Sequence, residues 1–164
     1  MSNDELLKLD NQLCFLLYAC SRGVTRTYRP LLAELDITYP QYLVMLVLWE
    51  EDGPSIKSLG RRLYLDSGTL TPLLKRLEAS GLIVRKRSSD DERIVKVLLT
   101  DKGKAMKERA YAIPEALLCP SGLSGEEFVG LKSLLETLLE RLRNFEANGK
   151  DCRDIMQSFK SEKA

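Results

Sequence analysis

The chain has 164 residues, of which 44% are hydrophobic and 30% are charged. A chain of this size forms one globular domain and buries enough surface to fold without a metal or a disulfide. It contains no histidine, and its four cysteines form no C-x-x-C pair. These features exclude histidine-based catalytic triads and zinc centres, so we expect no metal and no cofactor.

The sequence gives no sign of targeting to a membrane. Its N-terminus is acidic where a signal peptide would be basic, and no apolar run approaches the roughly 20 residues that span a bilayer. We therefore expect a cytoplasmic protein with no membrane partner and with thiols that are reduced at rest.

The formal net charge of +1 conceals an uneven distribution. Between Ser55 and Leu99 there are ten basic and five acidic residues, which gives +5, whereas the remainder holds 15 basic and 19 acidic residues, which gives −4. A basic centre between acidic ends suits a surface that faces phosphates. A solvated charged surface is the simpler alternative.

The N-terminal third predicts two helices. Apolar residues recur at helical spacing over residues 6–28, and Pro30 is expected to end this first amphipathic helix. Thr38 and Gln41 form a capping-box pattern for a second helix, which is expected to stop at Gly53.

The middle of the chain predicts two short helices and a hairpin. Ser55 is placed to cap a helix that reaches Leu65, and the Asp66-Ser67 pair offers the N-cap of another helix that stops at Gly81. The period then becomes two over residues 82–87 and 95–99, with Leu82 and Val84 alternating with Ile83 and Arg85. This pattern predicts two strands joined by a polar tip.

The C-terminal third predicts two more helices. One starts at Thr100 and runs towards Pro114, and the other follows the capping-box pattern of Ser124 and Glu127 and carries a leucine stripe over residues 131–142. The predicted fold class is therefore mainly α with a small β-hairpin wing, which is a winged helix-turn-helix between N- and C-terminal helices.

The order helix, turn, helix, basic hairpin is typical of DNA-binding proteins. The second helix of such a motif enters the major groove, and the wing reaches phosphates or the neighbouring minor groove. The alternative for the hydroxyl residues is ordinary helix capping, which is compatible with phosphate binding. The residues expected to contact DNA are Ser67, Thr69, Thr71, Lys75, Arg76, Arg85, Arg87, Asp91 and Arg93.

Four segments resemble a known family. Asp91-Glu92-Arg93, followed by Val97, Leu99 and Thr100, resembles the D-x-R wing signature of MarR-type winged-helix regulators. Residues 9–18, 37–42 and 64–72 are similar to the organic-hydroperoxide-sensing branch, the OhrR-type repressors. The resemblance extends to about Phe145. It implies a homodimer formed through residues 1–35 and 111–164, with residues 36–110 as the winged-helix DNA-binding region.

The resemblance also assigns roles to the cysteines. Taken alone, Cys14 is typical of a small buried hydrophobic residue. The resemblance implies that it is the peroxide-sensing cysteine of a two-cysteine member, in which Cys119 of the other subunit resolves the oxidised sulfur as a disulfide. A small cellular thiol is the alternative resolver, and Cys152 is a weaker one. Cys20 lies about 9 Å further along the expected helix and cannot reach Cys14.

Tyrosines complete the expected redox site. Tyr28 and Tyr39 match the phenols that hydrogen-bond the sensing sulfur from the partner subunit, and Tyr18 lies one helical turn after Cys14. The alternative is that these residues are core aromatics, as we expect for Tyr42 and Tyr64.

We therefore expect a redox-sensing transcriptional repressor, not an enzyme. It would bind double-stranded operator DNA when reduced and release it when an organic hydroperoxide oxidises Cys14. One alternative is a thiol peroxidase that uses Cys14 catalytically. Another is a MarR-type regulator that is released by a bound small aromatic ligand while its cysteines stay inert.

Overall fold

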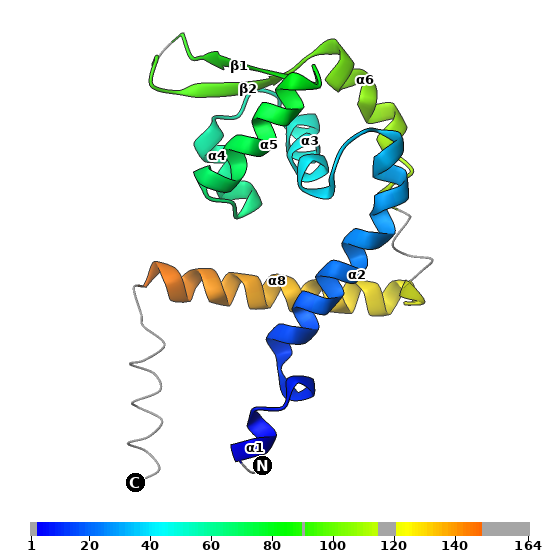
Figure 1. Ribbon diagram of the computed structural model, residues 1–164. Coiled ribbons are helices and arrows are strands. Elements are labelled where there is room, and N and C mark those ends of the chain that lie inside the picture. The colour runs from blue at the N-terminus through cyan, green and yellow to red at the C-terminus, as the bar shows by residue number, and fades with distance from the viewer. Residues whose placement is uncertain (1–2, 90, 115–120, 149–164) are drawn as a thin grey trace. The chain divides into compact units, whose positions relative to one another are not determined.

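The computed structural model describes residues 3–89, 91–114 and 121–148 (Figure 1). The chain divides into two compact units, Met1–Pro120 and Ser121–Ala164. The first unit contains α1 (Asn3–Leu6), η1 (Leu9–Asn11), α2 (Leu13–Glu34), α3 (Tyr39–Glu50), α4 (Ile56–Leu63), α5 (Ser67–Ala79), β1 (Ile83–Arg87), β2 (Val95–Leu99) and α6 (Asp101–Ala110). The second unit contains α8 (Gly125–Ala147). This order confirms the predicted class, which is mainly α with one antiparallel hairpin.

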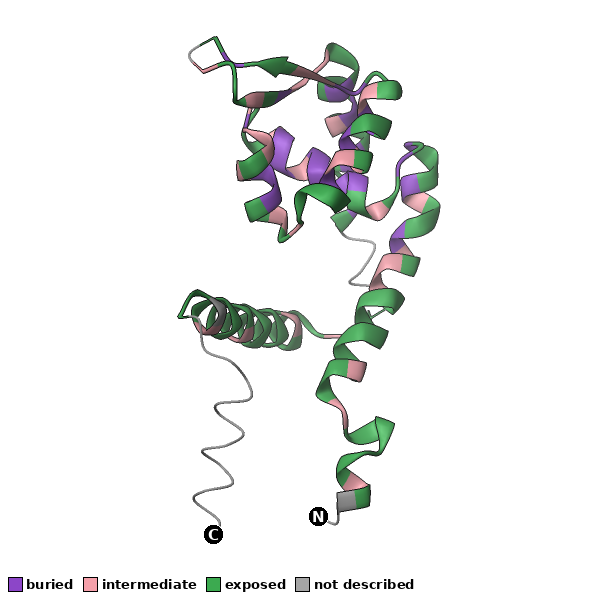
Figure 2. Cartoon of the chain, turned by 60° about the vertical axis from the view of Figure 1, so that its left-hand side comes forward, coloured by how far each residue is buried: buried purple, intermediate pink, exposed green. Residues whose placement is uncertain are grey.

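Helix α3 is the centre of the core of the first unit. It contacts α2, α4, α5, α6 and β2, and Val44 and Met45 are completely buried. Leu70, Leu74 and Leu77 of α5 pack into the same core. Figure 2 shows the buried residues of this unit in purple. No single helix among the described residues is long and apolar enough to cross a membrane, and α2 and α3 pass that test only as a pair bent by 73°.

The first helix differs from its prediction at both ends. It begins at Leu13, not near Leu6, because the preceding turns are closed by side chains: the Asn11 amide donates to the Glu5 carbonyl over 2.7 Å, and the Gln12 amide donates to the Leu6 carbonyl over 2.6 Å. Pro30 does not end α2, which continues to Glu34. Burial of the following Leu32 in the core outweighs the one backbone hydrogen bond that a proline removes.

The caps predicted for the helix-turn-helix are confirmed. The Ser55 hydroxyl accepts from the Ser58 amide over 3.0 Å, and the Asp66 carboxylate accepts from the Thr69 amide over 2.9 Å. Between the two helices Tyr64 takes a left-handed conformation with φ of 56°. Helices α4 and α5 are thereby held across a tight turn.

The hairpin has the predicted strands but a different inward face. Ile83 pairs with Leu99 and Arg85 pairs with Val97, so Ile83 and Val97 share the face that is buried in the core. The alternation in the sequence predicted that Val84 and Leu82 share the inward face. Val84 is only half-buried, because Leu82 precedes the strand and is buried independently. Helix α6 approaches this hairpin through Gly103, where a Cβ atom would lie 2.1 Å from the Leu82 carbonyl oxygen.

Helix α8 starts at the predicted capping box and is largely exposed. The Glu127 carboxylate accepts from the Ser124 amide over 2.8 Å, and the Ser124 hydroxyl accepts from the Glu127 amide over 3.2 Å. Its leucine stripe is uncovered, since Leu134 is 71% exposed and Leu142 is 51% exposed. The first turns of α2 are similarly exposed in Figure 2.

Candidate functional sites

The exposed face of α5 carries the hydroxyl and basic residues that the sequence singled out. Ser67, Thr69, Lys75 and Arg76 are exposed, whereas Thr71 is half-buried. The Thr69 hydroxyl donates to Asp66 over 2.9 Å, and hydrogen bonds from the Thr69 amide and hydroxyl hold the pKa of Asp66 below its ordinary value. Because Asp66 stays ionised, it continues to accept these hydrogen bonds and fixes the first turn of α5.

The tip of the hairpin presents Arg93 on a rigid support. Its guanidinium donates to both carboxylate oxygens of Asp91, over 3.0 and 3.1 Å, and its side chain is nevertheless 90% exposed. The side-chain hydrogen bonds from Arg93 lower the pKa of Asp91, so the pair persists at neutral pH. The Asp91–Arg93 pair of the D-x-R signature thus orients a positively charged side chain towards solvent at the tip of the hairpin.

The other two wing arginines differ in their surroundings. Arg85 is half-buried and donates to Glu78 through its amide, Nε and Nη2, which ties β1 to α5. Side-chain hydrogen bonds from Arg85 lower the pKa of Glu78. Arg87, at the end of β1, is exposed. A phosphate contact by Arg87 needs no rearrangement, whereas Arg85 has a structural role, and its contact with DNA stays a prediction.

Cys14 lies in the first turn of α2 and is exposed, as is Cys20 further along the same helix. The sequence placed Cys14 in the middle of a longer helix and so missed this position. Cys119 and Cys152 lie outside the described residues.

The tyrosines gather where α2 meets α3. The ring centroid of Tyr28 lies 5.3 Å from that of Tyr39 and 6.3 Å from that of Tyr42. Burial raises the pKa of Tyr28 and of Tyr39, so both phenols keep their protons as hydrogen-bond donors. Tyr18 is 58% exposed, away from this cluster, and accepts a hydrogen bond from Arg22 over 2.9 Å.

Within one chain, Cys14 does not meet these tyrosines. Cys14 and Tyr28 lie on the same uninterrupted helix. Their separation of 14 residues corresponds to about 21 Å along the axis at 1.5 Å per residue. A site that contains both the thiol and the phenols therefore requires two chains.

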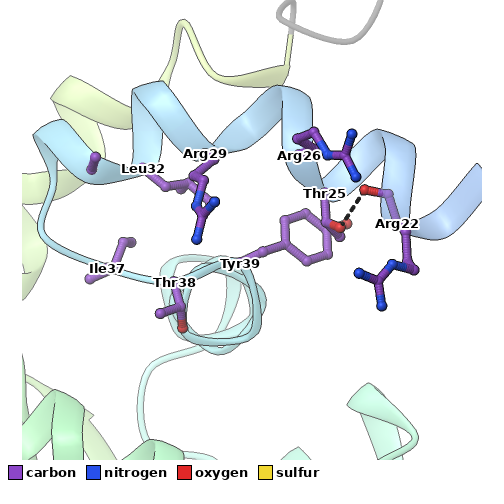
Figure 3. Close-up of a pocket in the computed structure, with 9 residues that line it drawn as sticks. Arg22, Thr25, Arg26, Arg29, Leu32, Ile37, Thr38 and Tyr39 are labelled. Carbon is purple, nitrogen blue, oxygen red and sulfur yellow. Dashed lines mark hydrogen bonds between the residues drawn. The ribbon is translucent and has the colours of Figure 1, made fainter.

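A cavity beside Tyr39 adds residues that the sequence reasoning missed. It has a volume of about 640 Å³ and includes Arg22, Arg26 and Arg29 of α2 in its lining, with no acidic residue among the lining residues. In Figure 3 the Tyr39 ring lies between the guanidinium groups of Arg22 and Arg29. The i, i+4, i+7 spacing of these arginines was the available signal. This positive cavity suits an anion.

The capped helix-turn-helix and the supported wing arginine define a winged-helix transcriptional regulator, and comparison with known proteins agrees. The family described as transcriptional regulator SarA/Rot matches residues 26–110. An organic hydroperoxide resistance transcriptional regulator of Bacillus subtilis is 58% identical over 136 residues, which are 83% of this chain and 92% of that protein. The chain therefore belongs to the MarR-type winged-helix transcriptional regulators, in the organic-hydroperoxide-sensing branch that its sequence resembles.

Two solved structures of the regulator AbfR from Staphylococcus epidermidis are also similar. Reduced AbfR bound to DNA is 42% identical, with a TM-score of 0.71, and the match covers 88% of this chain and 99% of that one. AbfR with a disulfide formed is 43% identical, with a TM-score of 0.56, and the match covers 83% and 96%. The expectation of a transcriptional regulator agrees with the printed name of the Bacillus subtilis relative and with the DNA-bound AbfR structure.

Proposed function

We propose that the protein is a dimeric repressor that binds operator DNA when Cys14 is reduced and releases it when an organic hydroperoxide oxidises that residue. The observation that carries this proposal is the separation of about 21 Å along α2 between Cys14 and Tyr28, against which Tyr39 of α3 packs. A redox site that joins the thiol to these phenols needs two chains. AbfR, the related regulator, is bound to DNA in its reduced form and also forms a disulfide.

The proposed chemistry proceeds in two balanced steps. The Cys14 thiolate attacks the outer oxygen of the hydroperoxide, the O–O bond breaks, and the alcohol leaves after taking a proton, which gives a sulfenic acid. The Cys119 thiol of the other subunit then displaces water and forms an intersubunit disulfide. The protonated phenols of Tyr28 and Tyr39 stabilise the thiolate by donating hydrogen bonds.

The parts of the chain are assigned as follows in this proposal. Residues 36–110 bind DNA, with α5 in the major groove and the hairpin tip beside it. Residues 1–35 and 111–164 form the dimer, in which the exposed leucines of α2 and α8 are covered.

A direct test uses a DNA duplex that the reduced protein selects from a random pool. One equivalent of cumene hydroperoxide is expected to weaken binding to that duplex at least about tenfold, a change of about 1.4 kcal/mol, and a dithiol is expected to restore it. Fluorescence anisotropy measures the affinity, and cumyl alcohol is the control. Unchanged affinity after complete oxidation of Cys14, verified by mass spectrometry, contradicts the proposal.

The dimer is tested separately by sedimentation velocity. We expect the wild type to sediment as a dimer at micromolar concentration, because the stripe of Leu131, Leu135 and Leu142 exposes apolar surface on α8. The double variant Leu131→Glu/Leu135→Glu is expected to dissociate, whereas Lys132→Gln, an exposed change on the same helix, is not. A stable wild-type monomer that still binds the duplex tightly argues against a two-chain redox site.

A second function is supported by the arginine-lined cavity. Its volume of about 640 Å³ lies within the range of small-molecule sites, and its charge suits an aromatic carboxylate. A regulator that such a ligand releases from DNA still responds to the ligand when Cys14 is replaced, whereas the redox-sensing repressor loses its response to hydroperoxide. Replacement of Cys14 therefore separates the two functions.

A further inference from the structure

Helix α6 extends from the base of the hairpin to the C-terminal end of α2 (Figure 1). Its N-terminal end is joined to the segment between α5 and β1. The Thr100 hydroxyl donates to the Gly81 carbonyl over 2.7 Å, and the Thr100 amide donates to the Leu82 carbonyl over 3.1 Å. The Lys102 ammonium donates to the carbonyl of Ser80, the C-cap residue of α5, over 2.8 Å. The first turn of α6 is therefore fixed to the end of α5 and to the start of the hairpin.

The last turn of α6 is joined to α2. The Arg109 guanidinium donates through Nη2 to the carbonyl of Glu34, the last residue of α2, over 2.7 Å. A carbonyl in the last turn of a helix has no partner within that helix and carries the negative end of the helix dipole, so a guanidinium is a favourable partner for it. No ion pair among the described residues competes for Arg109. Helix α6 thus connects the helix that carries Cys14 to the elements that are expected to contact DNA.

Helix α3 contacts α6 through Trp49. The Trp49 ring N–H donates to the Gly103 carbonyl over 2.9 Å, and the Lys107 ammonium donates to the Trp49 carbonyl over 3.2 Å. Trp49 is the single tryptophan of the chain. Its fluorescence therefore reports on the contact between α3 and α6.

We propose that α6 is a strut that transmits a displacement of α2 to the hairpin and to the end of α5, and that Arg109 is the positioning residue that joins this strut to α2. The inference rests on the proposed function, in which oxidation of Cys14 displaces the first turn of α2. Helix α2 is continuous from Leu13 to Glu34, which is about 33 Å at 1.5 Å per residue, so a displacement of one end moves the other. Close-packed contacts absorb little of such a movement.

The packing of α6 allows it to move against α3. Helix α3 is fixed in the core by larger apolar side chains such as Val44 and Met45, which are completely buried. The buried residues of α6 are only Gly103, Met106 and Ala110, which are two small residues and an unbranched side chain that adapts to its neighbours. Helix α6 can therefore slide along α3, while hydrogen bonds at its two ends hold it to α2 and to the hairpin.

The test compares Arg109→Met with Lys104→Met, which removes another exposed cation from the same helix. Fluorescence anisotropy with the selected duplex gives the ratio of reduced to oxidised affinity for each protein. For Arg109→Met we expect this ratio to fall at least about threefold below that of the wild type, because oxidised Cys14 then moves α6 less. Lys104→Met is expected to keep the wild-type ratio, and Arg109→Lys, which retains a charged donor, is expected to restore most of it.

The emission of Trp49 provides a second measurement that needs no DNA. Oxidation of the wild type is expected to shift the emission maximum, because sliding of α6 alters the hydrogen bond between Trp49 and Gly103. The shift is expected to be smaller in Arg109→Met. A merely structural role of Arg109 would lower the midpoint of thermal unfolding without changing either the affinity ratio or this shift.

The outcomes separate the strut from the proposed function. Circular dichroism establishes that each variant is folded, and mass spectrometry establishes that Cys14 is fully oxidised. A folded, oxidised Arg109→Met that keeps the wild-type affinity ratio overturns the strut, while release of the operator by hydroperoxide still stands. A wild type that releases the operator with unchanged Trp49 emission also overturns the strut, whether or not the variant folds. A wild type that stays bound after oxidation overturns the proposed function itself.

Discussion

Replacement of Cys14 by serine is expected to leave the protein bound to its operator after a dose of organic hydroperoxide that releases the wild type. A serine hydroxyl keeps the size of the thiol but does not attack the peroxide, since only a thiolate does so under these conditions. The reduced-state affinity is expected to stay close to that of wild type, because Cys14 is exposed at the start of α2 and belongs to none of the elements that are expected to contact DNA. Anisotropy before and after oxidant gives both values.

The Cys119→Ser variant separates sulfenic acid formation from disulfide formation. On nonreducing electrophoresis the wild type is expected to give a reducible covalent dimer and Cys14→Ser is not, whereas Cys119→Ser is expected to stop at a sulfenic acid that overoxidises. Joining two sulfurs requires their Cβ atoms to come within about 4 Å, so the bond forces a movement that one added oxygen does not. Oxidation is therefore expected to reduce the DNA affinity of this variant less than that of the wild type.

Cys20 supplies the control, because it is exposed on the same helix as Cys14 and cannot reach it there. Cys20→Ser is expected to behave as wild type in both assays. A covalent dimer that persists in Cys119→Ser transfers the resolving role to Cys20 or Cys152. A hydroperoxide response that persists in Cys14→Ser favours release by a bound ligand.

Local signals explain why most elements were predictable. Each cap of the helix-turn-helix is a side chain within three residues of the amide that it binds, as with Ser55 and Asp66, so the pattern is contained in a few letters. The start of α2 was not predictable in this way. The side-chain amides of Asn11 and Gln12 donate to carbonyls six residues earlier. No sequence pattern of asparagine or glutamine predicts a hydrogen bond over that separation.

The identity of the candidate site residues could be predicted from the sequence, but their exposure and hydrogen-bond partners could not. Arg85 and Arg93 are both wing arginines in the sequence, yet one is tied to Glu78 across 2.5 Å and the other is held outwards by Asp91. Only the register of β1 against β2 and the packing of α5 distinguish them. The separation of Cys14 from Tyr28, by contrast, follows from the predicted helix over residues 6–28, which already contains both residues.

Replacement of Arg93 by alanine is expected to weaken operator binding in the reduced and the oxidised protein alike. The Arg93 side chain is 90% exposed and fixed in direction by Asp91, so little conformational freedom is lost when it meets DNA. Loss of such a contact costs about 1–3 kcal/mol, or at least about fivefold in affinity, in each half-site. Titrations over a range of salt concentrations measure it.

Asp91→Asn provides the comparison that tests the support itself. An asparagine keeps the shape but loses the charge that aligns the guanidinium, so Arg93 remains present but less ordered, and we expect a smaller loss of affinity than for Arg93→Ala. The lowered pKa of Asp91 means that its contribution is present at neutral pH and is lost only as pH falls through that lowered value. Operator binding is therefore expected to gain nothing from this pair when pH rises above neutral. If Arg93→Ala binds as tightly as wild type throughout the salt series, the hairpin is not the wing that meets DNA, and the exposed Arg87 becomes the residue to test.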